Sequence, residues 1–194
     1  VELAITAVVD DAACPGPPCT LIELVDLRER REQEQRLERL AMFDPLTGLP
    51  NRLSLQVQME RALKGTRPMF GLLLINLDGF KEVNDSYGHD SGDALLQGVA
   101  HRLRSNLPEG TLVARQGSDD FVVMLPAESG DTEVRAVAQL VLATLARRFE
   151  VGPDQISITP TMGAVLVPQD GRVFAQLMRR LDAALHTGKQ QGRQ

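Results

Sequence analysis

The segment 69–77, MFGLLLINL, is the feature that most limits the folds open to this chain. It is apolar almost throughout and lacks the alternation of apolar and polar residues that marks a strand with one wet face. A strand of this kind is buried on both faces, so other elements must cover it from both sides. The segment breaks at Asp78-Gly79 into a polar stretch that runs to Asp93. We therefore expect these polar residues to lie at a functional edge of the sheet.

The order of the predicted elements around this strand indicates a mixed α/β fold, an α+β sandwich. Gly and Pro punctuate the chain, and the runs between them predict the order strand, helix, strand, strand, helix, strand. That order is typical of a split βαβ core flanked by helices. The predicted ranges are helix 51–64, strand 69–77, helix 79–107 with a break at Gly88, strands 111–115 and 120–125, helix 131–149, strand 156–167 and helix 173–188.

The stretch 115–121, RQGSDDF, lies between the apolar runs TLVA and VVML and predicts a β-hairpin. Its turn presents two adjacent carboxylates, Asp119 and Asp120. Carboxylates at such a tip are suitable ligands for Mg²⁺. The same pattern is compatible with a solvated acidic turn that has no chemical role, so the hairpin taken alone leaves both interpretations open.

Residues 1–26 contain two apolar stretches around a Pro-rich loop, CPGPPC, and predict a hairpin too small to fold alone. The two cysteines of this loop have neither redox nor zinc-site spacing, so we interpret it as a plain loop. Residues 27–43, LRERREQEQRLERLAMF, place opposite charges four residues apart and predict a helix. Because apolar residues return only at Leu37, Leu40 and Ala41, this helix is interpreted either as a dimerising signalling helix or as a solvated connector.

The composition limits the classes of partner. The 194 residues suffice for one domain and an appendage, with 43% hydrophobic and 24% charged residues, as in a globular domain. The net charge of −5 argues against nucleic acid as a partner, whereas a small nucleotide held by a few local cations is compatible with it. The sequence shows no signal peptide and no apolar run of about 18 residues. We therefore expect a cytoplasmic location, in a parent protein that could still be membrane-anchored.

Four ordered segments of the chain together resemble the GGDEF (diguanylate cyclase) family. They are DPLTGLPNR at 44–52, LDGFKEVNDSYGHDSGD at 77–93, RQGSDDF at 115–121 and LDAALHTGKQQGR at 181–193. The resemblance covers residues 42–194 and implies a palm-like five-stranded sheet. It divides the chain into a hairpin at 1–26 that is similar to the C-terminal end of a PAS-type domain, a signalling or linker helix at 27–43 and a GGDEF domain at 44–194.

The resemblance also implies a substrate. An active member of the family joins two GTP molecules into cyclic di-GMP and two pyrophosphates, and each half of a homodimer holds one GTP. The N-terminal helix is the implied dimer contact. Asn84 and Asp93 are the implied guanine readers, for which an amide and a carboxylate are chemically suited. The implied phosphate contacts are Gly79, Phe80, Lys81, Lys189 and Arg193.

The implied metal site departs from the family pattern. Active members need Mg²⁺ or Mn²⁺, and the resemblance places the metal ligand and catalytic groups at Asp119 and Asp120. Asn76 stands where the family carries a first Asp, and one neutral amide oxygen is a poor substitute for an anionic ligand. Asp78 is the nearby spare carboxylate. In the turn, Ser118 replaces the second Gly where φ is expected to be positive, and Asp120 is one methylene shorter than the family's Glu.

Two further family features are altered. The RxxD motif of the product-inhibition site corresponds to residues 108–111, Pro-Glu-Gly-Thr, so no product-inhibition site is expected. In the closing segment, His186 stands at an aromatic position that packs a helix face in the family, and Gly188 stands at the family's Ala. We interpret His186 as structural.

These departures leave three interpretations. The first is a degenerate GGDEF domain of cyclic di-GMP signalling that is catalytically inactive, binds GTP and regulates a neighbouring phosphodiesterase or sensor domain. The second is an active diguanylate cyclase that tolerates the changes. The third is a structural dimerisation or docking module that binds no nucleotide. We favour the first, because Asn76, Ser118 and Asp120 occur together.

Overall fold

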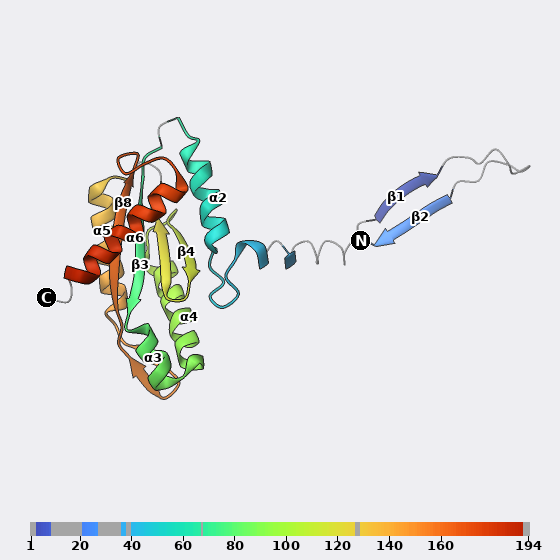
Figure 1. The fold of residues 1–194 in the computed structure, drawn as a ribbon. Coiled ribbons are helices and arrows are strands. Elements are labelled where there is room, and N and C mark those ends of the chain that lie inside the picture. Colours follow the sequence, from blue (N-terminus) through green and yellow to red (C-terminus); the bar gives the residue numbers. More distant parts are fainter. Residues whose placement is uncertain are drawn as a thin grey trace, which may run out of the picture. The chain divides into compact units, whose positions relative to one another are not determined.

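The computed structural model describes residues 3–8, 21–26, 36–37, 40–66, 68–126 and 129–191. The chain divides into two compact units, 1–41 and 42–194. In the first unit, β1 (Leu3–Val8) and β2 (Leu21–Asp26) pair as an antiparallel hairpin (Figure 1). This confirms the hairpin expected there. Its assignment to a PAS-type domain stays a prediction, and the CPGPPC loop lies outside the described residues.

The helix expected at 27–43 is described only in part. Residues 36–37 and 40–42 are helical, and the rest of that range, apart from Phe43, lies outside the described residues. Leu37 and Leu40 are 66% and 62% exposed, which fits a dimerising helix and a solvated connector equally well. The role of this helix in a dimer stays a prediction.

The second unit is built on one antiparallel sheet. β5 (Asp120–Met124) lies between β3 (Phe70–Asp78) and β4 (Leu112–Gly117) and is antiparallel to both. The unit formed by β3, the helices that follow it and β4 is therefore split, as the element order predicts. On the other side of β3 lies β8. The strands, in spatial order, are β4 (Leu112–Gly117), β5 (Asp120–Met124), β3 (Phe70–Asp78) and β8 (Thr159–Val167).

The number of strands in this sheet corrects the implied count of five. Within the described part of the chain the sheet has four strands. The predicted strand 156–167 corresponds to β8, which begins only at Thr159. Its first residue, Ile156, belongs instead to β7 (Asp154–Ile156), which pairs with β6 (Phe149–Val151) in a separate ribbon. The cause is local. Gly152 adopts a φ of +58° and closes a tight turn between β6 and β7, so these short strands pair with each other.

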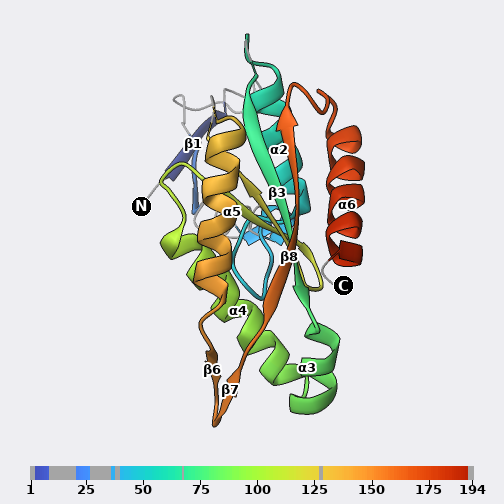
Figure 2. The same cartoon turned by 90° about the vertical axis from the view of Figure 1, so that its left-hand side faces the viewer.

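Helices cover both faces of the sheet, which confirms the mixed α/β fold. Figure 2 shows α5 and α6 on opposite sides of the strands. The first face carries α2 (Arg52–Leu63) and α6 (Phe174–Gln191), and the second carries α4 (His89–Asn106) and α5 (Asp131–Leu145). None of the helices in the described part of the chain is both long enough and apolar enough to cross a membrane.

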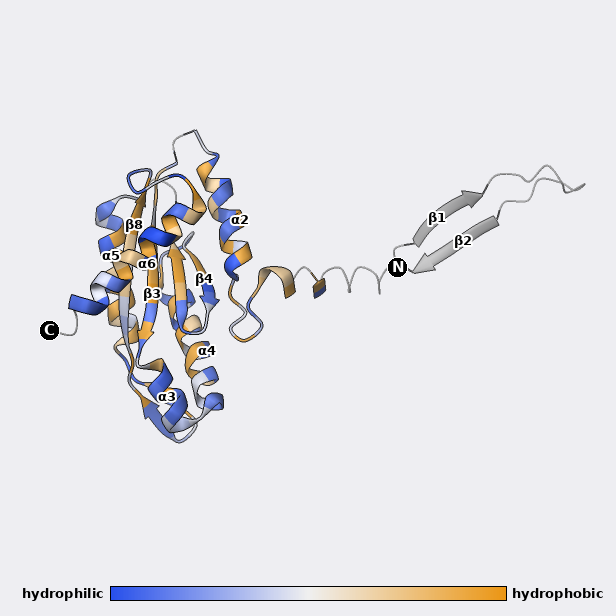
Figure 3. Cartoon of the chain, viewed as in Figure 1, coloured by the Kyte–Doolittle hydropathy of each residue, from blue (hydrophilic) through white to orange (hydrophobic). Residues whose placement is uncertain are grey.

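The side chains of β3 alternate between two apolar cores. Leu73, Ile75 and Leu77 belong to the core under α4 and α5. Phe70, Leu72 and Leu74 belong to the core under α2 and α6. This burial on both sides explains the absence of polar alternation in the sequence, and Figure 3 shows β3 as hydrophobic over much of its length. The side chains of the polar residues at the end of β3 alternate between the two faces of the sheet in the same way.

The chain leaves β3 through a glycine turn into two consecutive helices. Gly79, with a φ of +75°, precedes α3 (Phe80–Tyr87). Gly88, with a φ of +84°, separates α3 from α4, which confirms the break predicted at this residue. Because glycine adopts such angles most readily, Gly79 sets the direction in which α3 leaves the sheet, and Gly88 sets the direction of α4 relative to α3.

Candidate functional site

The candidate site lies at the end of β3 on the face covered by α6. Asn76 is opposite Asp120 on β5 and opposite Thr161 on β8. It is an even-numbered residue, like Leu72 and Leu74, so its side chain lies on the α6 face. Only 7% of Asn76 is exposed, so its amide must find partners within the protein.

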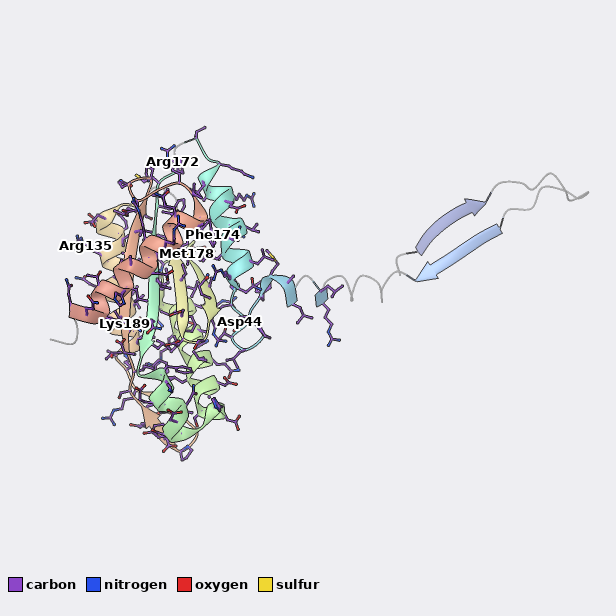
Figure 4. All side chains as sticks on the ribbon, viewed as in Figure 1. Asp44, Arg135, Arg172, Phe174, Met178 and Lys189 are labelled. Carbon is purple, nitrogen blue, oxygen red and sulfur yellow. The ribbon has the colours of Figure 1, made fainter. Side chains whose placement is uncertain are left out.

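The amide of Asn76 finds these partners in three charged side chains. Its Nδ2 donates to Oδ2 of Asp119 at 2.9 Å and to Oδ1 of Asp120 at 2.8 Å. Its Oδ1 accepts a hydrogen bond from Nζ of Lys189. Lys189 belongs to α6, and Figure 4 shows it beside β3. One neutral side chain therefore links both hairpin carboxylates to a lysine from the last helix.

Burial and charge both affect the carboxyl group of Asp120. Burial raises the pKa of Asp120 above its ordinary value, and the neighbouring Asp119 carboxylate raises it further. The hydrogen bond from Asn76 and the charge of Lys189 act in the opposite direction. The Asp120 carboxylate thus depends on Asn76 for much of its support.

Asp78, the predicted spare carboxylate, points to another strand. Oγ1 of Thr161 lies 2.8 Å from both of its oxygens, which share the single hydroxyl hydrogen, and Oγ1 of Thr159 lies 3.4 Å from one of them. Both threonines are on β8, whereas Asp119 and Asp120 are on the side of β5. Asp78 is therefore near the two carboxylates but already engaged elsewhere.

A pocket of about 550 Å³ opens beside this cluster. It joins the predicted acidic end of the site to most of the predicted phosphate contacts. Sequence reasoning missed Thr159, Pro160 and Thr161, whose only signal is a polar start to a strand. The predicted residues that line the pocket are Asn76, Asp78, Gly79, Phe80, Lys81, Asp119 and Lys189, and Leu77, Glu82 and the three β8 residues complete it.

The predicted guanine readers lie outside the lining of this pocket, where α3 packs on α4. Asn84 is half-buried and Asp93 is exposed. Between them in space is Gly92, where an added Cβ would lie 1.9 Å from Oδ1 of Asn84. Gly92 therefore lets Asn84 rest against α4 one residue from Asp93, a requirement that the sequence analysis did not identify. Arg193 lies outside the described residues.

His186, interpreted as a structural residue of a packed helix face, is exposed. Its Nε2 lies 2.9 Å from Nε2 of Gln190, one turn along α6. The expected packing is therefore corrected, because the α6 residues that reach the core are Leu177, Met178 and Leu181.

Arg115 connects the hairpin to the segment 44–52, the first of the four segments that resemble the family. Its guanidinium contacts Asp44 at 3.0 and 3.2 Å and donates two hydrogen bonds to the backbone oxygen of Ser118. Asp44 also accepts from the backbone N–H and the hydroxyl of Thr47. Sequence reasoning treated Arg115 only as a strand residue. The sequence signal for this contact was the presence of an Asp in the segment 44–52 and of an Arg just before the hairpin turn.

Acid should weaken the contact between Asp44 and Arg115. Although burial acts to raise the pKa of Asp44, hydrogen bonds from Thr47 and Arg115 lower it below its ordinary value. A depressed folded pKa adds stability above the unfolded pKa, about 3.9, and loses it as pH falls through the folded pKa. The Asp44→Asn variant should therefore be less stable than the natural chain at pH 7, with a gap that closes below about pH 4.

Denaturant unfolding from pH 7 to pH 3 measures that gap. Asp131→Asn is the matched control, because Asp131 forms only an exposed ion pair with Arg135 within α5. An Asp44→Asn gap that is constant over the whole pH range would contradict the prediction.

The hairpin turn contains Ser118 at the position of the family's second Gly, where a side chain is predicted to strain the backbone. Ser118 has a φ of +38°, among the described residues the one positive φ outside glycine. A side chain in this region destabilises the backbone by about 1 kcal/mol. The expected result is that Ser118→Gly raises the free energy of unfolding by somewhat less than this, since glycine also gains freedom in the unfolded chain. Urea unfolding checks it, and Ser118→Ala, which keeps the strain, should change little.

The divalent cation that the resemblance implies, Mg²⁺ or Mn²⁺, does not fit the donors present. The space between Asp119 and Asp120 is occupied by the Nδ2 hydrogens of Asn76, which would face a cation with the wrong polarity. Across the described residues, no group of three or more His, Cys, Asp and Glu is placed to hold a metal ion. Asp78 does not complete such a group, and its carboxylate accepts a hydrogen bond from Thr161 on β8.

Comparison with known proteins identifies the family. The sequence model for the diguanylate cyclase, GGDEF domain matches residues 41–194. The chain belongs to the GGDEF family. This GGDEF domain superposes on the solved GGDEF domain of TpbB (YfiN) from Pseudomonas aeruginosa with a TM-score of 0.73 and 33% identity, over 77% of this chain and 89% of that one.

Curated relatives of the GGDEF domain are longer proteins. It is 36% identical over 162 residues to the bifunctional diguanylate cyclase/cyclic di-GMP phosphodiesterase MucR of Pseudomonas aeruginosa, covering 82% of this chain and 24% of that protein. It is 34% identical over 169 residues to the cyclic di-GMP phosphodiesterase PdeR of Escherichia coli, covering 87% and 25%. The chain thus spans about a quarter of the length of these relatives. It is a GGDEF domain of cyclic di-GMP signalling.

Proposed function

We propose that this GGDEF domain makes no cyclic di-GMP and acts as a regulatory module that binds GTP. The observation that supports this most directly is the pair of hydrogen bonds from Asn76 to Asp119 and Asp120. An amide that donates to both carboxylates stands where catalysis needs an anionic ligand. Phosphoryl chemistry of this class depends on a cation that offsets charge on the transferring group, so its loss is severe.

The hairpin adds two further defects to the proposal. Ser118 occupies a left-handed position that favours glycine, and its side chain adds bulk at the turn. Asp120 carries its carboxylate one methylene closer to the backbone than the family's Glu, and catalysis is sensitive to displacements of about 1 Å. The three substitutions act on the same few ångströms of the site, which favours a lost activity over a tolerated one.

Nucleotide binding is proposed to survive because most of its groups are separate from these defects, and Lys189, which contacts Asn76, still lines the pocket. Gly79 and Lys81 line the same pocket as Lys189, so backbone amides and two cations are available to phosphates. Phe80 would support this turn, and Arg193 would add a third cation. Asn84 and Asp93 would read the guanine edge, since an amide and a carboxylate complement its donors and acceptor.

The proposed partners follow from the relatives. MucR combines cyclase and phosphodiesterase activities, and PdeR is a phosphodiesterase, so we place this domain beside a phosphodiesterase or a sensor domain in a longer cytoplasmic or membrane-anchored protein. The segment before Met42 would join two copies through its helix. In such a protein, a GTP-bound module reports nucleotide supply to its neighbour.

Two measurements test the proposed function together. The purified chain is incubated with GTP and Mg²⁺ or Mn²⁺ at high protein concentration, and cyclic di-GMP is sought by chromatography. Calorimetric titration then compares GTP with ATP. The expected result is no product and a clear preference for GTP that Asp93→Asn weakens. Accumulation of product would establish an active cyclase, and equal heats for GTP and ATP would contradict guanine reading.

A further inference from the structure

The orientation of the Asn76 amide is fixed by its surroundings. Its Nδ2 faces Asp119 and Asp120, and its Oδ1 faces the ammonium of Lys189. If the amide were reversed, its oxygen would face two carboxylates and its N–H groups would face a cation. All three contacts would then be repulsive. The amide therefore acts as a double donor toward the carboxylates.

This arrangement satisfies the acidic end of the pocket from within the chain. Each carboxylate receives one N–H of the same amide, at 2.9 and 2.8 Å. Lys189 supplies the positive charge on the far side of that amide. Because Asn76 is buried on the central strand, it cannot swing aside to admit an ion. The third nearby carboxylate, Asp78, is held by Thr161.

We propose that Asn76 and Lys189 together replace the divalent cation, so that this pocket works as a metal-free nucleotide site. Its nucleotide part rests on the proposed function, whereas its metal part does not. With Asp at position 76, three carboxylates would converge and require a cation. With Asn, the same position supplies the donors that a cation would otherwise replace. GTP binding is then indifferent to Mg²⁺ in the solution.

Mn²⁺ alone tests the metal part without any nucleotide. Electron paramagnetic resonance of free Mn²⁺ is followed as the natural chain or the Asn76→Asp variant is added. The natural chain should leave the free signal unchanged, and Asn76→Asp should bind at least about tenfold more tightly, the size of effect expected from one added anionic ligand. Asn106→Asp adds the same charge at an exposed end of α4 and should leave the signal unchanged.

Asn76→Ala is a second variant, included in case Asn76→Asp fails to fold. It removes the amide without adding a charge, so the two hairpin carboxylates lose their internal donors and should take up Mn²⁺, more weakly than with Asp at position 76. Circular dichroism and the thermal transition show which variants are folded. Equal Mn²⁺ affinity in the natural chain and the folded variants, whether measurable or absent, would overturn the proposal, because Asn76 would then not decide metal binding.

GTP titrations with EDTA or with Mg²⁺ test the nucleotide part. The natural chain should bind GTP within about twofold in the two buffers, whereas Asn76→Asp should lose at least about tenfold in EDTA, the loss expected when an anionic ligand set lacks its cation. A natural chain that needs Mg²⁺ for GTP would overturn the metal-free site. No GTP binding by either protein in either buffer would count against the proposed function instead, and the Mn²⁺ experiment would still decide the metal part.

Discussion

The triple variant Asn76→Asp, Ser118→Gly, Asp120→Glu is expected to make cyclic di-GMP, whereas the natural domain is expected to make none. The three changes act together on one small region. Asp at position 76 restores an anionic ligand in place of a double donor, Gly at position 118 fits the observed φ of +38°, and Glu at position 120 returns the missing methylene. The rest of the pocket, including Lys81 and Lys189, stays in place.

The single variant Asn76→Asp should recover less activity than the triple variant. Catalytic groups that act as a unit are far from additive, so a restored ligand cannot compensate for a displaced hairpin. The measurement is cyclic di-GMP formed per hour with GTP and Mg²⁺ or Mn²⁺, at a protein concentration that allows dimers. The double variant Ser118→Gly, Asp120→Glu is the matched control, because it repairs the hairpin and leaves Asn76. It should make no product.

One outcome would show that the cause of inactivity lies in other residues. If the triple variant is folded, dimeric and bound to GTP and yet makes no product, the three residues are not sufficient. The closing segment around His186 and Gly188 would then be the next place to repair. Gly188 is close to β8, where an added Cβ would lie 3.2 Å from Cγ2 of Thr161, so the family's Ala would need a small shift at that point.

Much of the fold was predictable because its sequence signals depend on residues that are near one another in the chain. The apolar run of β3, the break at Gly88 and the hairpin after Arg115 each depend on neighbouring residues. The division of strand 156–167 was not predictable from its apolar pattern. There the tight turn at Gly152 pairs β6 with β7 locally, so the strand of the central sheet begins only after this ribbon.

The site was predictable in its residue types and not in its contacts. That Asn76 is a poor ligand follows from its chemistry alone. That it donates to both Asp119 and Asp120 depends on the register of β3 on β5, which brings together residues more than 40 positions apart. The contact of Arg115 with Asp44 spans an even longer stretch of sequence. Spacing within one motif carries no information on such pairs.

Gly163→Ala is expected to be among the most destabilising single substitutions in this domain. Gly163 lies on β8 directly under α6. An added Cβ would lie 2.6 Å from both the backbone oxygen of Leu181 and the backbone nitrogen of Leu185. Backbone atoms cannot rotate away as a side chain can, so α6 must move off the sheet. Overpacking of this kind lowers the free energy of unfolding by about 3 kcal/mol.

The predicted change in the free energy of unfolding is opposite in sign to the change that strand propensity alone predicts, so a measurement separates the two. Alanine normally fits a strand at least as well as glycine, so propensity alone predicts a neutral or stabilising change. For a domain of this size, about 3 kcal/mol corresponds to a fall in Tm of roughly 6–12 °C. Calorimetry of Gly163→Ala beside Ala164→Ser, a change at the exposed neighbour on the other face of β8, measures the difference.

The same substitution should also disturb the site. α6 carries Lys189, whose ammonium is bonded to Asn76, and the close approach of α6 to β8 at Gly163 sets how far that lysine reaches. GTP binding should therefore weaken in Gly163→Ala at temperatures where the variant is still folded, whereas Ala164→Ser should bind as the natural chain does. A Tm within about 2 °C of the natural chain, which corresponds to less than about 1 kcal/mol, would mean that α6 tolerates the methyl group and that its packing does not position Lys189.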